Sequence, residues 1–385
     1  MVSSGGQYGE RRTMEIQKGP GQLKQDLATP ALLLDLDVFE ANLKRMASHA
    51  RGAHVSLRPH SKSHKCPEIA KRQIAAGAVG VCVTTIREAE NMSAGGVDGL
   101  LITSEMIGKN RIERLVRLTR EHPDTMSVVD NPAHATELSA AAMAGKVYLN
   151  VMVDLDLGLK RTGVAGVTQG LDLAEKVMTL PNLRLRGLHA YSSMSAHVIG
   201  FDDRRAHSHK AMEPALDLFS QMRERGMPAE ILTGGSTGTY NIDTELEGVS
   251  ELQPGSYVFM DVDYFKIGGR FGPLYNDFGF SLKVMATVVS KNHQGFATVD
   301  AGFKAFATDR PFGPELRDAP EVVYHFGGDE HGILEFPHSD RGVRLGDRLE
   351  FVVPHCDPTV NLYDRIYCVR EDAIEGVWTI KRGYD

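Results

Sequence analysis

Several features that define common protein classes are scarce in this sequence of 385 residues. Only four cysteines occur, none in a C-x-x-C pair, so we expect reduced thiols in a cytoplasmic protein. No uncharged apolar run approaches the roughly 18 residues that a membrane span needs. The polar, glycine-rich start, residues 1–22, has no apolar segment, so we expect no signal peptide there.

An excess of basic residues is also absent, because 43 Lys and Arg stand against 50 Asp and Glu, a formal net charge of −7. A chain with this balance has no electrostatic reason to bind nucleic acid or anionic lipid. Its one dense basic stretch, "LRPHSKSHK" at residues 57–65, therefore indicates a local anion site.

No G-x-G-x-x-G follows an early strand, so a dinucleotide-binding sheet lacks its signature. Instead, strand-like runs alternate with helical patterns, which favours parallel β-α-β units. Eight such runs lie before residue 255: "HVSLR", "GVCVTT", "GLLIT", "TMSVVD", "VYLNVMVD", "LRLRGLHAY", "EILTGG" and "GVSELQPG". Eight strands close a (β/α)8 TIM-type barrel of roughly 200 to 250 residues, which we place at 37–265.

Past about residue 270 the pattern changes to strand-like runs separated by Gly, Asn and Asp, with little helical periodicity. We therefore expect a C-terminal all-β domain at 266–385, with strands in "FSLKVMATVVSKN", "GFATVDAG", "DRLEFVVPH", "RIYCVRE" and "IEGVWTIKRG". A further strand at about 31–36 has no place in a barrel of eight. We expect the segment 25–36 to join the β domain.

The basic stretch follows the first barrel strand. If the chain stays extended, one face of it carries Arg58, His60, Lys62 and His64, and that face looks into the barrel mouth. Burial and like charge would then lower the pKa of Lys62 and leave a neutral amine, which can form a Schiff base. The alternative is a solvated basic loop.

A glycine-rich loop, "LTGGSTGTYN" at 232–241, follows the seventh barrel strand. Converging backbone N–H groups and the hydroxyls of Ser236, Thr237 and Thr239 are typical of a phosphate site. An ordinary Gly/Ser/Thr loop is the alternative.

A short His-x-Asp pattern occurs in "VPHCDPT", residues 353–359. His355 and Asp357 share a face, while Cys356 points the other way. One imidazole and one carboxylate supply part of the coordination shell of a divalent cation and leave positions for water or substrate. A strand end capped by an aspartate before Pro358 is the alternative.

Two further barrel strands end in polar side chains. Arg161 follows the fifth strand, where it is either a surface residue or a guanidinium aimed at an anionic oxygen. His189, Tyr191 and His197 follow the sixth. Single histidines are more often structural, although this end of a barrel strand is where catalytic residues lie.

Taken together, these stretches resemble one family. A "RPHxKxHK" segment, a "TGGxTG" loop, "QPGSYVFMD" at 253–261, "DEHG" at 329–332 and "PHxDPTxNLxD" at 354–364 are similar to D-threonine aldolase. The wider group holds D-3-hydroxyaspartate aldolases and D-serine dehydratases, on the alanine-racemase type of fold. The resemblance runs from about residue 28 to the C-terminus.

The resemblance implies pyridoxal 5′-phosphate (PLP) as the cofactor. It implies Lys62 as the Schiff-base lysine, His60 and Arg58 beneath the cofactor, and Arg161 near its phenolic oxygen. It also implies a phosphate cup formed by Ser236, Thr237, Gly238 and Thr239. Two tyrosines, Tyr191 and Tyr257, would line the pocket, and Tyr257 would reach the phosphate.

The same resemblance implies that His355 and Asp357 bind Mn²⁺, Mg²⁺ or a similar hard cation, and that His197 takes the proton of the substrate hydroxyl. The expected reaction cleaves a D-β-hydroxy-α-amino acid to glycine and an aldehyde. A homodimer with the active site near the subunit contact is implied as well.

Two departures from the family pattern concern the pocket: Ser192-Ser193 replaces a frequent His-Gly pair, and Thr84 replaces a frequent Gln. They leave open which β-substituent the substrate carries, and 3-hydroxyaspartate is one of the candidate substrates. Dehydration to a keto acid and ammonia stays an alternative, although Asp357 replaces the cysteine of dehydratase relatives. A non-catalytic PLP carrier protein is the remaining alternative.

Overall fold

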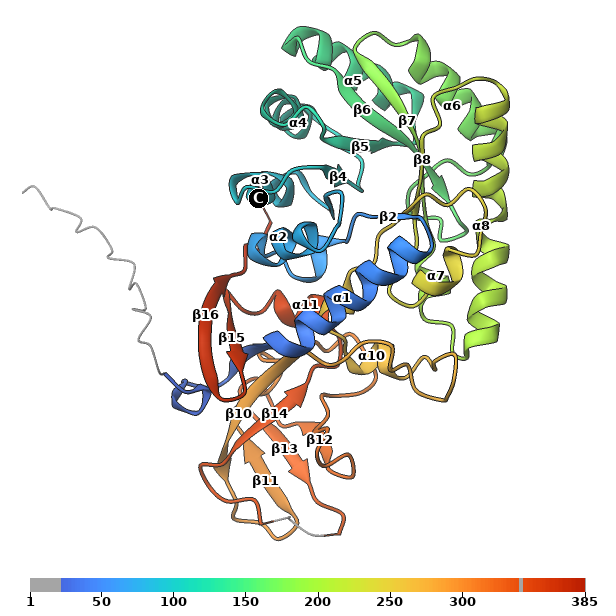
Figure 1. Ribbon diagram of the computed structural model, residues 1–385. Coiled ribbons are helices and arrows are strands. Elements are labelled where there is room, and N and C mark those ends of the chain that lie inside the picture. Colours follow the sequence, from blue (N-terminus) through green and yellow to red (C-terminus); the bar gives the residue numbers. More distant parts are fainter. Residues whose placement is uncertain (1–21, 339–341, 385) are drawn as a thin grey trace, which may run out of the picture.

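The computed structural model describes residues 22–338 and 342–384, which form two sheets of eight strands each (Figure 1). Most of the polar start, on which the signal-peptide expectation depends, lies outside the described residues. None of the helices in the described ranges is both long and apolar enough to cross a membrane.

The first sheet is parallel, in the order β2-β9-β8-β7-β6-β5-β4-β3. A parallel bridge between His60 and Cys82 connects its two outer strands, so the ladder closes on itself. The barrel predicted from eight apolar runs is thereby confirmed. Its strands are β2 (Ser56–Leu57), β3 (Val81–Val83), β4 (Leu100–Ile102), β5 (Met126–Val129), β6 (Leu149–Asp156), β7 (Leu183–Tyr191), β8 (Ile231–Gly234) and β9 (Glu251–Leu252).

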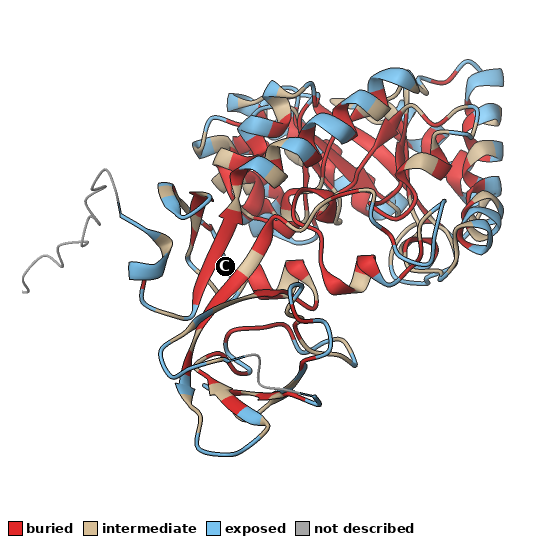
Figure 2. Cartoon of the chain, turned by 60° about the horizontal axis from the view of Figure 1, so that its bottom comes forward, coloured by how far each residue is buried: buried red, intermediate tan, exposed pale blue. Residues whose placement is uncertain are grey.

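Helices surround this sheet, and their outer faces are exposed while the strands are buried (Figure 2). The longer ones are α1 (Leu36–Gly52), α2 (Pro67–Ala75), α3 (Ile86–Ala94), α4 (Lys109–Glu121), α5 (Pro132–Gly145), α6 (Val167–Thr179) and α8 (Phe201–Glu224). Local signals start several of them. The side chain of Thr85 accepts from the backbone of Glu88 at the start of α3, and Asn131 caps α5 just before Pro132.

Short helical turns lie at the ends of barrel strands and in the β domain, and several of them carry site residues. They are η1 (Lys24–Asp26), η2 (Ser61–Ser63), α7 (Ser193–Ala196), α9 (Tyr240–Asp243), η3 (Ser256–Val258), α10 (Val262–Phe265) and α11 (Cys356–Val360).

The second sheet is mostly antiparallel, in the order β12-β13-β11-β10-β1-β15-β16, with β14 paired to β10. Its strands are β1 (Ala31–Asp35), β10 (Leu282–Ser290), β11 (Phe296–Val299), β12 (Val323–Phe326), β13 (Gly332–Glu335), β14 (Arg348–Val352), β15 (Arg365–Arg370) and β16 (Ala373–Thr379). The N-terminal strand β1 runs antiparallel to β10 and parallel to β15, so it lies within the C-terminal sheet. Strands β12 and β13 were not among those expected from the sequence.

The end of the barrel segment and the end of β14 are joined by backbone hydrogen bonds. The N–H of Val262 donates to the carbonyl of Val353, and that of Asp263 to Pro354, both at 3.1 Å. The N–H of Cys356 donates to the buried Oδ2 of Asp261 at 2.9 Å. These contacts hold the turn that carries the His-x-Asp pattern against the barrel.

Candidate active site

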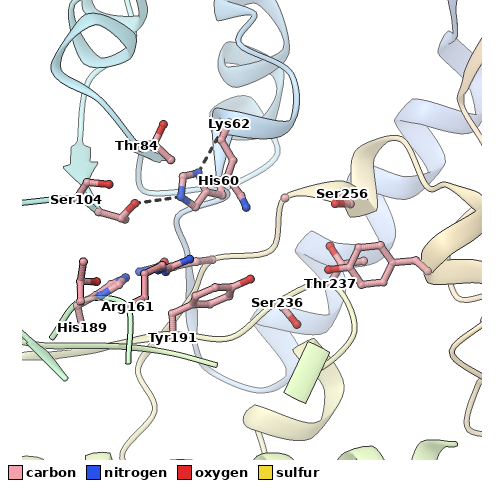
Figure 3. A pocket seen from close by; sticks show the side chains of 15 residues that line it. His60, Lys62, Thr84, Ser104, Arg161, His189, Tyr191, Ser236, Thr237 and Ser256 are labelled. Atoms are coloured by element: carbon pink, nitrogen blue, oxygen red, sulfur yellow. Dashed lines mark hydrogen bonds between the residues drawn. The ribbon is translucent and has the colours of Figure 1, made fainter. Parts of the chain in front are cut away.

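A cavity of about 250 Å³ lies at the C-terminal ends of the barrel strands. Its lining includes six side chains predicted from the sequence: His60, Lys62, Arg161, Tyr191, Ser236 and Thr237. Figure 3 shows that they converge on one space from the start of η2, from the end of β7 and from the segments after β6 and β8. This is the end of a barrel at which the catalytic groups of such enzymes lie.

Lys62 sits in the turn η2, and its Nζ lies 3.5 Å from Oδ2 of Asp357, which belongs to the β domain. The carboxylate of Asp357 raises the pKa of the Lys62 amine, against the effect of burial. The predicted lowering of this pKa is therefore wrong. The sequence showed the positive neighbours of Lys62 but not a carboxylate almost 300 positions away.

The expectation that Arg58, His60, Lys62 and His64 share one face is also wrong. Strand β2 ends at Leu57 and the chain turns into η2 after His60, so the strand alternation stops there. Arg58 is buried in an ion pair with Glu251, with Nη2 3.0 Å from Oε2, and does not line the cavity. His64 is fully buried against the ring of Phe259.

His60 lines the cavity as a neutral imidazole. Burial, reinforced by the nearby charge of Lys62, lowers its pKa well below the usual value. Its Nδ1 accepts from the backbone N–H of Lys62 at 3.4 Å, so its Nε2 donates to the hydroxyl of Thr103 at 3.1 Å. These two bonds fix the ring beside the lysine.

The glycine-rich loop after β8 is built from internal hydrogen bonds. The backbone N–H of Ser236 donates to Oγ1 of Thr239 at 3.1 Å, and the Thr239 hydroxyl donates to the buried carboxylate of Asp243 at 2.6 Å. At Gly238 a side chain is excluded, because a Cβ would lie 2.1 Å from the carbonyl oxygen of Ala196. Gly238 and Thr239 therefore shape the loop, whereas Ser236 and Thr237 line the cavity.

A second loop completes this polar side of the cavity. Gly255 and Ser256 line it next to Ser236 and Thr237, so two Gly/Ser/Thr segments face one space. Sequence reasoning missed Ser256, although a Gly-Ser pair directly after the last barrel strand was a usable signal. Two such loops suit a phosphate, which accepts hydrogen bonds from hydroxyl and backbone N–H groups.

The prediction that Tyr257 reaches the phosphate is wrong. Its hydroxyl accepts a hydrogen bond from Nε2 of Gln73 at 3.2 Å, and its buried ring packs on Phe278. The turn η3 begins at Ser256, and successive side chains of a 3-10 turn point in different directions. The Ser256 side chain therefore faces the cavity, whereas that of Tyr257 faces the core. Tyr264, not predicted, lines the cavity instead.

The floor of the cavity holds an aromatic and an imidazole group. The guanidinium carbon of Arg161 lies 5.8 Å from the centre of the Tyr191 ring. His189 is buried with Nδ1 2.5 Å from Oδ1 of Asp154. Burial alone would lower the pKa of His189, but the Asp154 carboxylate raises it above the usual value.

Two predicted histidines lie beside the Lys62–Asp357 contact, each next to a carboxylate. The Nδ1 of His355 donates to Oδ2 of Asp309 at 2.7 Å, and Nδ1 of His197 lies 3.2 Å from Oδ2 of Asp263. Burial lowers the pKa of His197 despite Asp263, and the positive charge of Arg310 lowers it further.

The described residues contain no cluster of three or more His, Cys, Asp or Glu that could hold a metal. His355 and Asp357 still offer two ligands of types that bind divalent cations. With Nδ1 of His355 engaged by Asp309, its Nε2 remains for a metal, the usual arrangement of a metal-binding histidine. A hard cation that keeps waters or takes substrate oxygens fits such an open pair.

Comparison with known proteins agrees with this geometry. Residues 34–263 match the family model of the alanine racemase N-terminal domain, and residues 281–369 match the putative serine dehydratase domain. The chain belongs to the alanine racemase N-terminal domain family. Membership of this family implies PLP as the cofactor, and the cavity with its lysine and two Gly/Ser/Thr loops fits that molecule.

Relatives within this family include the 3-hydroxy-D-aspartate aldolase of Paracoccus denitrificans (strain Pd 1222), 33% identical over 376 residues and 96% of each chain. The D-threonine aldolase of an Arthrobacter species is 36% identical over 366 residues and 95% of each chain. The crystal structure of D-threonine aldolase from Filomicrobium marinum superimposes with a TM-score of 0.89 at 36% identity, covering 94% of this chain and 98% of that one. The resemblance inferred from the sequence is thereby confirmed.

Proposed function

We propose that this chain is a PLP- and divalent-metal-dependent aldolase that cleaves D-β-hydroxy-α-amino acids of the D-threonine type to glycine and an aldehyde. The observation that carries the proposal is the 3.5 Å contact between Nζ of Lys62 and Oδ2 of Asp357. It brings the cofactor lysine of the barrel and a metal ligand of the β domain to one point. The aldolases among the relatives support the same reaction class.

Each residue of the site has a task in this proposal. Lys62 would hold the cofactor covalently, Arg161 would face its phenolic oxygen, and the loops with Ser236, Thr237, Gly255 and Ser256, which line the same cavity, would hold its phosphate. Bound PLP supplies an electron sink for the electrons of the broken Cα–Cβ bond.

The β domain and His197 handle the substrate hydroxyl. His355 and Asp357 would hold Mn²⁺ or Mg²⁺, which would lower the pKa of that hydroxyl. His197 accepts the hydroxyl proton as a general base, a role that suits an imidazole whose pKa is kept below the usual value by burial. As the proton leaves, the β-carbon becomes an aldehyde and the Cα–Cβ bond breaks. A proton added at Cα then completes glycine.

We further propose a cytoplasmic homodimer with the active site near the subunit contact. All four cysteines are free and buried, which suits a reducing compartment. Relatives that match over nearly the whole chain support one shared architecture.

Product analysis tests the reaction. The PLP-loaded protein is incubated with D-threonine and with D-3-hydroxyaspartate, with Mn²⁺ and with a chelator. We expect glycine and acetaldehyde from D-threonine, lost on chelation and restored by Mn²⁺. Ammonia and a keto acid instead of glycine would establish a dehydratase. Absence of turnover on a panel of D-β-hydroxy amino acids would favour a PLP carrier.

A further inference from the structure

One guanidinium lies between two carboxylates at the side of the candidate site. Nη1 of Arg310 donates to Oδ2 of Asp309 at 3.0 Å, and Nε of Arg310 lies 2.8 Å from Oδ2 of Asp263. Each of these carboxylate oxygens also faces an imidazole: Asp309 meets Nδ1 of His355, and Asp263 meets Nδ1 of His197. The five side chains form a continuous polar chain from one histidine to the other.

The two ends of this chain belong to different domains. His197 follows the short helix α7 of the barrel, and Asp263 lies in α10 after the last barrel strand. His355, Asp309 and Arg310 belong to the β domain, where His355 directly precedes α11. Arg310 therefore connects a histidine–carboxylate pair of one domain to a histidine–carboxylate pair of the other.

We infer that Arg310 is a positioning residue that fixes both imidazoles through Asp263 and Asp309. Nδ1 of His355 is bonded to Asp309 and Nδ1 of His197 faces Asp263, so Nε2 is the nitrogen left to act, as metal ligand at His355 and as base at His197. The roles of the two histidines rest on the proposed function, whereas the link between them is seen directly in the contacts of Arg310.

Charge explains why an arginine is suited to this position. Asp263 and Asp309 are both anionic acceptors, and one planar guanidinium can face the two carboxylates through different N–H groups. A lysine offers the charge at a single point and cannot reproduce this fork. Oδ2 of Asp263 lacks a well-aligned hydrogen bond, so its position depends on the ion-pair contacts with Arg310 and His197.

Arg310 is poorly suited to the other role that a cation near the metal ligands suggests, recognition of an anionic β-substituent. Its guanidinium already faces two carboxylates, so little of its positive charge is left for a substrate. The geometry thus favours a role in holding protein groups over one in binding a substrate carboxylate.

The test measures metal affinity and kinetics separately on the PLP-loaded holoenzyme. Arg310→Gln keeps a polar but shorter side chain and removes its charge, and Arg310→Lys keeps the charge. We expect Arg310→Gln to weaken Mn²⁺ binding by about tenfold or more, the range seen for groups that orient a metal ligand. Free Mn²⁺ is read by electron paramagnetic resonance. The kcat for D-threonine should fall more than KM rises, and Arg310→Lys should restore part of both.

Two further variants keep the inference falsifiable. Asp309→Asn removes the negative charge that His355 and Arg310 share while leaving the Arg310 side chain in place, and should weaken Mn²⁺ binding by a similar factor if Arg310→Gln fails to fold. Arg225→Gln breaks an exposed ion pair with Glu175 on the outer helices and should change neither quantity.

Unchanged Mn²⁺ affinity in Arg310→Gln and Asp309→Asn would overturn the inference, as would a wild-type protein that binds no Mn²⁺. If the wild type binds Mn²⁺ but cleaves no D-β-hydroxy amino acid, the proposed function fails while the affinity measurements still decide the role of Arg310.

Discussion

The barrel loop on the phosphate side of the candidate site is held largely by barrel residues, whereas the β-domain turn with the His-x-Asp pattern is held by the barrel as well as by Asp309 of its own domain. The loop after β8 is fixed by Thr239 and Asp243, both barrel residues. The turn that carries Asp357 instead meets Lys62 and is tied by its backbone to Asp261. Under the proposed function we therefore expect the barrel to hold the cofactor and the second domain to supply the metal ligands.

The largest effect is expected from Lys62→Ala, which removes the cofactor attachment that the barrel provides. Aldolase turnover should fall by about a thousandfold or more, because the amine proposed to hold the cofactor covalently is gone. Borohydride reduction should no longer fix the cofactor to the protein, as read by mass spectrometry. Retained fixation would remove Lys62 from this role.

Asp357→Ala tests the other half of the comparison, because it alters only the β domain. We expect cleavage of D-threonine to fall by about a hundredfold, since the metal loses one of two protein ligands. Cofactor absorbance and borohydride fixation at Lys62 should persist. Loss of the cofactor together with the metal would show that the two domains do not divide the work in this way.

A pH effect on stability is expected inside the barrel at Asp243. Burial raises the pKa of this carboxyl to about 6, while Ser208 and Thr239 donate to it. The folded protein then binds the proton more tightly than the unfolded chain. The contribution of Asp243 to the free energy of unfolding is therefore fully present below about pH 4 and falls by about 3 kcal/mol as the pH rises through 6.

Urea unfolding of the wild type and Asp243→Asn between pH 4 and 7 measures this contribution. The difference between the two free energies should shrink with rising pH. Asp172→Asn, at an exposed position of α6, is the matched control and should show no such trend. A pH-independent difference at Asp243 would contradict the proposed cause.

The contrast between the barrel and the β domain also explains which parts of the fold and of the site could be predicted from the sequence. Buried parallel strands appear as continuous apolar runs, so all eight barrel strands were predicted, and basic or Gly/Ser residues at their ends marked Lys62 and Ser236. Strands β12 and β13 have four residues each and were missed, because β12 has no buried residue and β13 begins with a glycine, which weakens a strand signal. The partners of Arg310 were out of reach, since its pairing with Asp263 depends on how the two domains meet.

The smallest effect is expected from Tyr257→Phe, which tests whether the Tyr257 hydroxyl contacts the cofactor phosphate. The sequence placed this hydroxyl at the phosphate, whereas the structure places it against Gln73 in the core. We therefore expect PLP affinity to change by no more than about twofold, and the free energy of unfolding to drop by about 1 kcal/mol for the lost hydrogen bond. Fluorescence titration of PLP and urea unfolding measure the two quantities.

Ser256→Ala is the counterpart to Tyr257→Phe at the neighbouring residue, because Ser256 lines the cavity. A hydrogen bond to a charged phosphate is worth about 1.5 to 3 kcal/mol, so PLP affinity should fall by about tenfold or more. If the two variants exchanged these outcomes, with Tyr257→Phe losing PLP and Ser256→Ala keeping it, the phosphate cup would have to be rebuilt around the tyrosine. The turn η3 would then present the opposite side chain to the cofactor.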